Sequence, residues 1–215
     1  MTKLKVITDH PVAWESPDHI FPVGTKNDNS TSAPYIEEVE RHFGGRKINV
    51  MDIGCAGGQL IVDFANRGHN AIGLEGSDYD IKHGLHNWPS YYKNVLWTAD
   101  LTKPLRIENE DGERVLFDII SAWEVVEHIS REDLPAFFDN VLDQLKPDGI
   151  FVSSVNMGPD TRRDEHGNLH VLHQTVFPEA FWKEVLLAGR DVSAYPFQTV
   201  VRNCTNSFYM TMRKR

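Results

Sequence analysis

Short apolar runs alternate with amphipathic segments through most of the chain. Five of these runs are rich in Val, Ile, Leu and Phe and carry few charges, which is the pattern of strands buried on both faces of a parallel sheet. The expected strands are KINVMDI (47–53), NAIGLEG (70–76), NVLWTAD (94–100), VLFDIISAW (115–123) and IFVSSV (150–155).

The segments between these runs repeat their apolar residues at helical spacing. Ser32 is placed to cap the first helix, Pro34 falls in its first turn, and Pro147 and Gly149 are expected to close a later helix. The expected helices are STSAPYIEEVERHF (30–43), GQLIVDFANRG (58–68), DYDIKHGL (78–85), EDLPAFFDNVLDQLKPDG (132–149) and PEAFWKEVLLAG (178–189).

Strands that alternate with helices predict an α/β fold with a doubly wound, mostly parallel sheet. The last two apolar runs, at 191–197 and 206–213, have no long helix between them. They predict a hairpin that adds an antiparallel strand to the sheet. Residues 106–114 are interpreted as a hairpin or loop insertion.

The region before the first expected helix has a different composition. Residues 8–33 are rich in Pro, Asp, Asn and Ser, with isolated aromatic residues. We interpret 1–33 as an irregular N-terminal arm, which either docks on the core as a lid or packs loosely against it. Residues 34–215 are expected to form one domain, a size that suits a single hydrophobic core.

Composition and charge narrow the possible settings and partners. The two cysteines, Cys55 and Cys204, give no disulfide framework, and no window is as long and apolar as a membrane helix requires, so a cytoplasmic location is expected. The net charge of -9, with RKR at 213–215 as the one basic cluster, counts against a long nucleic-acid partner.

The first strand-to-helix turn, VMDIGCAGGQL (50–60), has the most informative pattern. Glycines there permit a tight turn and close approach of a ligand to the backbone. A dinucleotide fingerprint would need glycines where Ala56 and Gln59 stand. Glu75 ends the second strand and suits ribose hydroxyls, while Asp100 ends the third and suits the exocyclic amine of adenine.

Five successive stretches resemble the motifs of class I S-adenosylmethionine-dependent methyltransferases, in the right order over about 46–155. They are VMDIGCAGGQL, GLEGSD, TADL, FDIISAWEVVEHI and LKPDGIFVSSV. The resemblance implies a Rossmann-like fold and S-adenosyl-L-methionine as cofactor. The cofactor-binding residues that it implies are Asp52, Gly54, Cys55, Gly57, Gln59, Glu75, Gly76, Ser77, Asp100, Leu101, Trp123 and Glu124.

The stretch WEVVEHI (123–129) follows the fourth strand. If it forms a helical turn, Glu124, Glu127 and His128 fall at i, i+3 and i+4 and share one face. Such a face suits a divalent cation with O and N ligands, or a general base beside a methyl acceptor. It resembles the E-x-x-E-H signature of ubiquinone-biosynthesis O-methyltransferases, which carries a divalent ion.

A histidine-rich segment, DEHGNLHVLHQTVF (164–177), follows the fifth strand. Its HVLHQTVF part loosely resembles a segment of small-RNA terminal 2′-O-methyltransferases, which implies that His173, or else His170, completes the metal site. The expected metal ligands are therefore Glu124, Glu127, His128 and His173, for Mg or Mn, and the expected catalytic residues are His128, His173 and Glu127. The alternative is a histidine that lines an acceptor pocket without metal.

These features predict an S-adenosylmethionine-dependent enzyme, a monomer or homodimer, that methylates oxygen of a small polar or sugar-like acceptor. The first alternative is a metal-dependent methyltransferase acting on the terminal 2′-hydroxyl of an RNA 3′ end. The others are a cofactor-binding module without catalysis and a nicotinamide oxidoreductase.

Overall fold

The computed structural model describes residues 3–197 and 207–215. Its main sheet has seven strands in the order β10-β11-β7-β6-β2-β3-β4. The strands are β2 (Asn49–Ile53), β3 (Asn70–Glu75), β4 (Leu96–Thr98), β6 (Phe117–Trp123), β7 (Leu145–Asn156), β10 (Val192–Ala194) and β11 (Ser207–Lys214).

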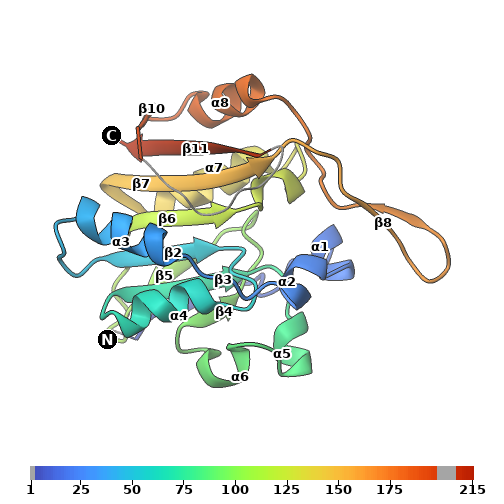
Figure 1. Ribbon diagram of the computed structural model, residues 1–215. Coiled ribbons are helices and arrows are strands. Elements are labelled where there is room, and N and C mark those ends of the chain that lie inside the picture. The colour runs from blue at the N-terminus through green and yellow to red at the C-terminus, as the bar shows by residue number, and fades with distance from the viewer. Residues whose placement is uncertain (1–2, 198–206) are drawn as a thin grey trace.

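The five strands from β4 to β7 are parallel, whereas β11 runs antiparallel to β7 and β10 antiparallel to β11 (Figure 1). The predicted fold class, a doubly wound and mostly parallel sheet with an antiparallel C-terminal strand, is confirmed. The parallel strands are buried on both faces, as their near-continuous apolar runs require.

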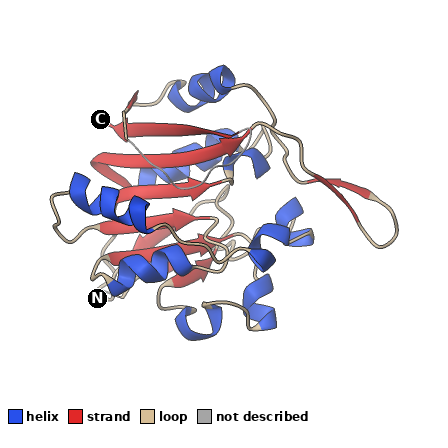
Figure 2. Cartoon of the chain, in the orientation of Figure 1, coloured by secondary structure: helices blue, strands red, loops and turns tan. Residues whose placement is uncertain are grey.

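Helices cover both faces of this sheet (Figure 2). Helix α3 (Ala33–His42) precedes the first strand of this sheet. The helices between its strands are α4 (Gln59–Asn66), α5 (Tyr79–His83), α6 (Trp88–Tyr91), α7 (Leu134–Gln144) and α8 (Glu179–Leu187). As expected, Ser32 caps α3, because its side chain accepts a hydrogen bond from the Tyr35 amide.

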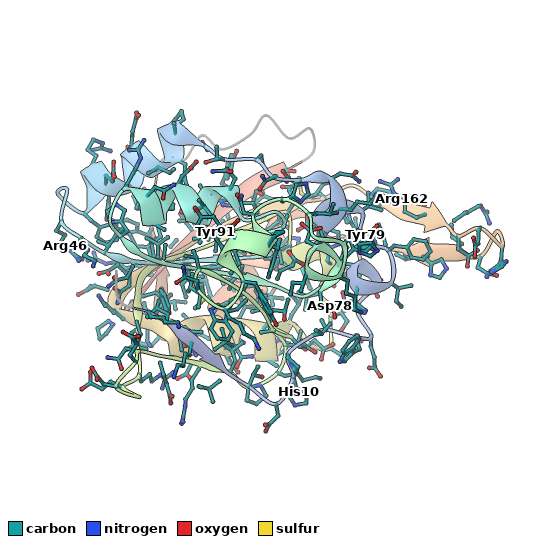
Figure 3. All side chains as sticks on the ribbon, turned by 90° about the horizontal axis from the view of Figure 1, so that it is seen from below. His10, Arg46, Asp78, Tyr79, Tyr91 and Arg162 are labelled. Carbon is teal, nitrogen blue, oxygen red and sulfur yellow. The ribbon has the colours of Figure 1, made fainter. Side chains whose placement is uncertain are left out.

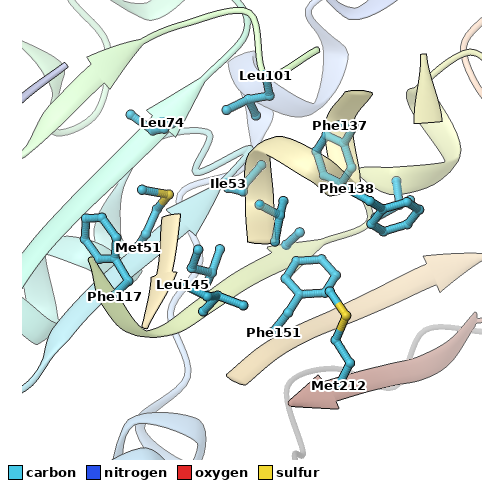
Figure 4. Packing of buried hydrophobic residues seen from close by; sticks show 14 of the residues in the cluster. Met51, Ile53, Leu74, Leu101, Phe117, Phe137, Phe138, Leu145, Phe151 and Met212 are labelled. Atoms are coloured by element: carbon cyan, nitrogen blue, oxygen red, sulfur yellow. The ribbon is translucent and has the colours of Figure 1, made fainter. Parts of the chain in front are cut away.

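Two hydrophobic clusters hold these layers together. One lies between the sheet, α7 and α8, and contains Phe137, Phe138 and Trp182 (Figure 4 shows part of it). The other lies between the sheet, α3, α4 and α6, and contains Ile36 and Phe64. Two packed faces fix the sheet, and with it the direction in which the carboxyl ends of the strands point.

Some expected boundaries were wrong. Helix α7 ends at Gln144, and β7 begins at Leu145, so the Pro and Gly expected to close the helix lie inside the strand. Residues 106–114 do form a hairpin, closed by an antiparallel bridge between Glu108 and Arg114. Its first strand, β5 (Arg106–Glu108), also pairs antiparallel with β1 (Lys5–Ile7), which was not expected. The short helix α6 was not expected, since four residues carry too little periodicity to identify a helix.

The N-terminal arm is more regular than expected, because it contains β1, α1 (Pro17–Ile20) and α2 (Val23–Asn27). The segment after β7 forms a hairpin of β8 (Thr161–Arg163) and β9 (Leu169–Val171), which projects from the body (Figure 1). Among the described residues, no helix is long and apolar enough to cross a membrane. Cys204 lies outside the described residues, and Cys55 is a buried free cysteine.

Parallel strands place their carboxyl ends at one end of the molecule. Asp78 and Tyr79, which follow β3, lie at the same end as Arg162 of β8, and Arg46 lies at the opposite end (Figure 3). The arm helices α1 and α2 lie at the first of these ends (Figure 1). A ligand site is expected there, outside the carboxyl ends of the strands.

Candidate active site

The turn between β2 and α4 has no room for a side chain at Gly54. Gly54 has φ +66°, and a Cβ atom built on it would lie 2.4 Å from Cγ2 of Val125. The amides of Gly54 and Cys55 both donate to the Leu74 carbonyl, at 2.8 and 3.1 Å, which fixes the turn against β3. Gly54 is therefore required by both its conformation and its surroundings.

We expect Gly54→Ala to lower the free energy of unfolding by about 3 kcal/mol, because left-handed strain adds to overpacking against Val125. Urea unfolding measures this change. Gly68→Ala is the matched control: Gly68 has φ +94° and no heavy atom within 4 Å of the added Cβ, so it reports strain alone, about 1 kcal/mol. Equal losses in the two variants would show that the contact with Val125 is unimportant.

A cavity of ≈ 780 Å³ opens beside this turn, at the carboxyl ends of the strands. Its volume lies in the range of small-molecule and cofactor sites. The residues of the expected cofactor set that line it are Gly54, Glu75, Gly76, Asp100, Leu101, Trp123 and Glu124. The structure thus brings together the tips of β2, β3, β4 and β6.

Glu75 lies at the centre of this arrangement and is 7% exposed. Its Oε2 accepts a hydrogen bond from the Ala56 amide at 2.9 Å, and its Oε1 accepts from the Ser77 amide at 3.2 Å and from Thr25 Oγ1 at 3.3 Å. Burial raises the pKa of Glu75 to about 7, although these amides favour the carboxylate. The carboxylate is therefore held rigidly at the edge of the cavity.

Asp100 also lines the cavity, and its Oδ1 accepts hydrogen bonds from the amide and hydroxyl of Thr102, at 2.9 and 2.7 Å. These bonds orient the carboxylate at the tip of β4. The neighbouring Leu101 is almost buried, so the two residues present one polar and one apolar group side by side.

The remaining members of the expected cofactor set, Asp52, Cys55, Gly57, Gln59 and Ser77, are not among the lining residues. Asp52 is buried in the sheet, where it accepts a hydrogen bond from Ser121 Oγ at 2.5 Å. Burial raises its pKa to about 7. These residues support the turn and the strand tips instead of facing the cavity.

The stretch after β6 differs from the expected helical turn. A 3-10 helix spans Val126–His128, whereas Glu124 precedes it with φ +55°. Glu124 Oε2 accepts hydrogen bonds from Asn156 Nδ2 and Ser207 Oγ, each at 3.0 Å, and so faces β7 and β11. The expectation that Glu124 shares one helical face with Glu127 and His128 is therefore wrong.

Three of the four expected metal ligands do lie together. Among the described residues, Glu127, His128 and His173 each offer a ligand atom within 4.8 Å of the other two. Glu127 is fully buried; its Oε1 accepts a hydrogen bond from the Asn156 amide at 2.9 Å, but its Oε2 has no hydrogen-bond partner in the part of the chain described. Burial raises the pKa of Glu127 to about 7.

An oxygen faces Nδ1 of each imidazole in this group, with hydrogen-bond geometry for His173 and only at ion-pair distance for His128. His128 Nδ1 lies 2.9 Å from Asp18 Oδ2, and His173 Nδ1 lies 2.5 Å from the Gly158 carbonyl. The ring centroids are 4.6 Å apart. Burial lowers the pKa of both histidines, but the Asp18 carboxylate outweighs this for His128, whose pKa lies above its usual value. Because these oxygens face the Nδ1 atoms, the Nε2 atom of each ring remains available.

Reasoning from the sequence offered docking of the N-terminal arm as one of two alternatives but named none of its residues as part of the site. Its residues from Ala13 to Asp28 supply one wall of the cavity, and Asp160, before β8, lines it as well. The arm has no motif of its own. The contact between Asp18 and His128 joins residues far apart in the chain, so it leaves no local sequence pattern. The abundance of Asp, Asn and Ser was a signal of polar loop structure, not of a particular site.

Comparison with known proteins is consistent with this geometry. A family model described as a methyltransferase domain matches residues 30–184. The ubiquinone biosynthesis O-methyltransferase of Chelativorans sp. is 32% identical over 142 residues, which cover 60% of this chain and 52% of that protein. The Rickettsia typhi protein of the same name is 26% identical over 147 residues, covering 66% and 56%. The chain thus spans about half the length of these curated relatives.

Solved structures with low sequence identity share the fold. An S-adenosylmethionine-dependent methyltransferase from Clostridium acetobutylicum has a TM-score of 0.62 and 13% identity, with 91% of this chain and 97% of that chain covered. A Burkholderia thailandensis 1,6-didemethyltoxoflavin-N1-methyltransferase, with S-adenosylhomocysteine bound, has a TM-score of 0.57 and 18% identity, with 92% and 84% covered. The chain therefore belongs to the methyltransferase-domain family, with the fold of class I S-adenosylmethionine-dependent methyltransferases.

Proposed function

We propose that the protein transfers a methyl group from S-adenosylmethionine to a hydroxyl oxygen of a small polar acceptor. The observation that carries this proposal is one cavity that joins the glycine turn, Glu75 and Asp100 to the pair His128 and His173. The first group suits an adenosyl cofactor, and the pair suits the removal of a proton. Family membership and relatives named O-methyltransferases support it.

The cofactor would lie across the strand tips. Its amino-acid end would meet the backbone at Gly54, its ribose hydroxyls would donate to Glu75, and its adenine amine would donate to Asp100 beside Leu101. Among the residues that the structure describes, eight carboxyl groups and one lysine line the cavity, which favours the cationic sulfonium; they are Glu15, Asp18, Asp28, Glu75, Asp100, Glu124, Asp133 and Asp160, with Lys103.

Methyl transfer is an in-line displacement. The acceptor oxygen forms a bond to the methyl carbon as the carbon–sulfur bond breaks, and the sulfonium becomes a neutral thioether. The hydroxyl proton must leave at the same stage, and a neutral imidazole is suited to take it. We assign this role to His128, because Asp18 stabilises the imidazolium that would form, with His173 and Glu127 beside it.

The same residues also fit a divalent cation such as Mg or Mn. Among the described residues Glu127 Oε2 is a buried oxygen without a partner. The Gly158 carbonyl orients His173 through Nδ1, and the Asp18 carboxylate faces Nδ1 of His128 at ion-pair distance, as oxygen groups often do beside metal-bound histidines. Glu127, His128 and His173 would hold the ion; Glu124 is not part of this close group, and its Oε2 accepts hydrogen bonds from Asn156 and Ser207. A bound ion would lower the pKa of the acceptor hydroxyl.

The acceptor should be neutral or cationic. A cavity lined by many carboxyl groups repels phosphates and carboxylates, which counts against an RNA 3′ end. A cytoplasmic location and a monomeric or homodimeric state remain predictions from the sequence.

Two measurements test the proposal. Calorimetry should show that S-adenosylhomocysteine binds and that nicotinamide cofactors do not. Transfer of a labelled methyl group should then occur to members of a panel of sugars, catechols and other hydroxylated compounds, but not to short RNA, with each reaction run in EDTA and in manganese. Binding without transfer to any acceptor would instead support a non-catalytic module, and manganese-dependent transfer to RNA would support the nucleic-acid alternative.

A further inference from the structure

The N-terminal arm crosses three strand tips through backbone hydrogen bonds. The His10 carbonyl accepts from the Asp100 amide, the Ala13 amide donates to the Gly76 carbonyl, and the Asp28 carbonyl accepts from the Gly57 amide, at 2.9, 2.9 and 2.8 Å. These contacts connect the arm to the ends of β4 and β3 and to the glycine turn. The arm thus has a defined path over the cavity.

Helix α1 presents Asp18 to the cavity along this path. Ser16 caps the helix by accepting a hydrogen bond from the Asp18 amide at 3.2 Å, which fixes the backbone of the aspartate. Phe21, which follows the helix, packs on His170 of the β8–β9 hairpin with ring centroids 4.3 Å apart. The position of Asp18 is therefore set from both ends of α1.

The two histidines of the site are held in different ways. His173 binds the carbonyl of Gly158, which belongs to the same segment that follows β7. His128 faces the charged groups of Asp18, Glu127 and Asp160, and Asp18 is at ion-pair distance from its Nδ1. The orientation of His128 thus depends on a distant part of the chain, whereas that of His173 does not.

We propose that Asp18 is a positioning residue that orients the imidazole of His128, so that docking of the arm completes the reaction centre. A carboxylate at ion-pair distance from Nδ1 favours, by its charge, the tautomer that is protonated there and carries the lone pair on Nε2. That tautomer is needed for His128 to take a proton and equally for it to bind a cation. This role presupposes the proposed methyl transfer, but the contact with His128 exists without it.

Nitrogen NMR of the histidine side chains tests the contact directly, in the ligand-free protein at alkaline pH, where the rings are neutral. The signals of His128 are assigned with His128→Gln. We expect the Nδ1-protonated form in the unchanged protein and in Asp18→Asn, whose Oδ1 still accepts, and a shift toward the other tautomer in Asp18→Ala. An unchanged His128 tautomer in Asp18→Ala would overturn the proposal, whether or not an acceptor has been found.

Kinetic measurements then distinguish a residue that positions His128 from one that only lines the cavity. Asp18→Ala should lower kcat by roughly 10- to 100-fold, while the Kd of S-adenosylhomocysteine stays within about threefold; Asp18→Asn should recover most of the lost rate. Asp9→Ala, which removes an exposed carboxylate of the same arm outside the cavity lining, is the matched control and should be unaffected. If the affinity for S-adenosylhomocysteine fell as much as kcat, Asp18 would be a residue that lines the cavity and not one that positions His128.

Discussion

Glu75→Gln should weaken the binding of S-adenosylhomocysteine by roughly 10- to 100-fold, the range expected for lost hydrogen bonds to a charged group. Both oxygens of Glu75 already accept hydrogen bonds from protein donors, Ala56 N on one side and Ser77 N with Thr25 Oγ1 on the other. An amide has one acceptor oxygen, so in either orientation its NH₂ group meets a donor. The variant therefore loses the ribose contact and loosens the glycine turn.

Calorimetry measures the change in affinity, and urea unfolding shows whether the variant remains folded. Glu15→Gln is the matched control, because it removes a negative charge from an exposed residue that lines the same cavity. Its Kd should stay within about threefold of the original value. If both variants bind alike, the cavity attracts the cofactor only through its overall charge, and the assigned ribose contact is wrong.

His128→Ala should lower kcat by about 10²- to 10⁴-fold, the usual contribution of a general base. The side chain contacts Asp18, lies beside His173 and is not one of the groups assigned to the cofactor, so the affinity for S-adenosylhomocysteine should hardly change. The separation of these two effects identifies a residue that acts on the acceptor. The rate is measured with the acceptor that gives the fastest transfer in the panel.

His83→Ala is the control for this experiment, because His83 is exposed, stacks on Tyr79 and does not line the cavity. It should keep full activity. A His128→Ala variant that keeps its kcat would remove His128 from the reaction centre and leave His173 and Glu127 as the remaining candidates.

The tips of the parallel strands could be predicted from the sequence because they follow from regular structure. Once the runs before Gly54, Glu75 and Asp100 are read as adjacent parallel strands, their ends must meet at one edge of the sheet. Buried strands also carry the clearest pattern in a sequence. The seven expected cofactor residues that line the cavity were therefore predicted from topology, which tolerates errors of a residue or two in the strand bounds.

The error at Glu124 has a local cause. The i, i+3, i+4 rule applies only where the backbone is already helical, and here the helical turn begins at Val126. The left-handed conformation of Glu124 turns its carboxylate toward Asn156. Such a conformation at a non-glycine residue is stabilised by tertiary contacts, which the surrounding sequence does not reveal.

The contact between Asp18 and His128 lies beyond local reasoning for another reason. It depends on the course of a segment that has only short helices, and the two residues are far apart in the chain. Only the complete set of arm contacts determines which side chain reaches the site.

The pairing of β1 with β5 limits how this arm can move. The three-residue ladder fastens the chain just before residue 8, and α3 fastens it again after residue 32. We expect a segment attached at both ends to move outward only in its middle, without rotating away as a whole. We therefore expect entry and departure of a bound molecule to need only a local bulge of the arm, with both of its ends kept in register.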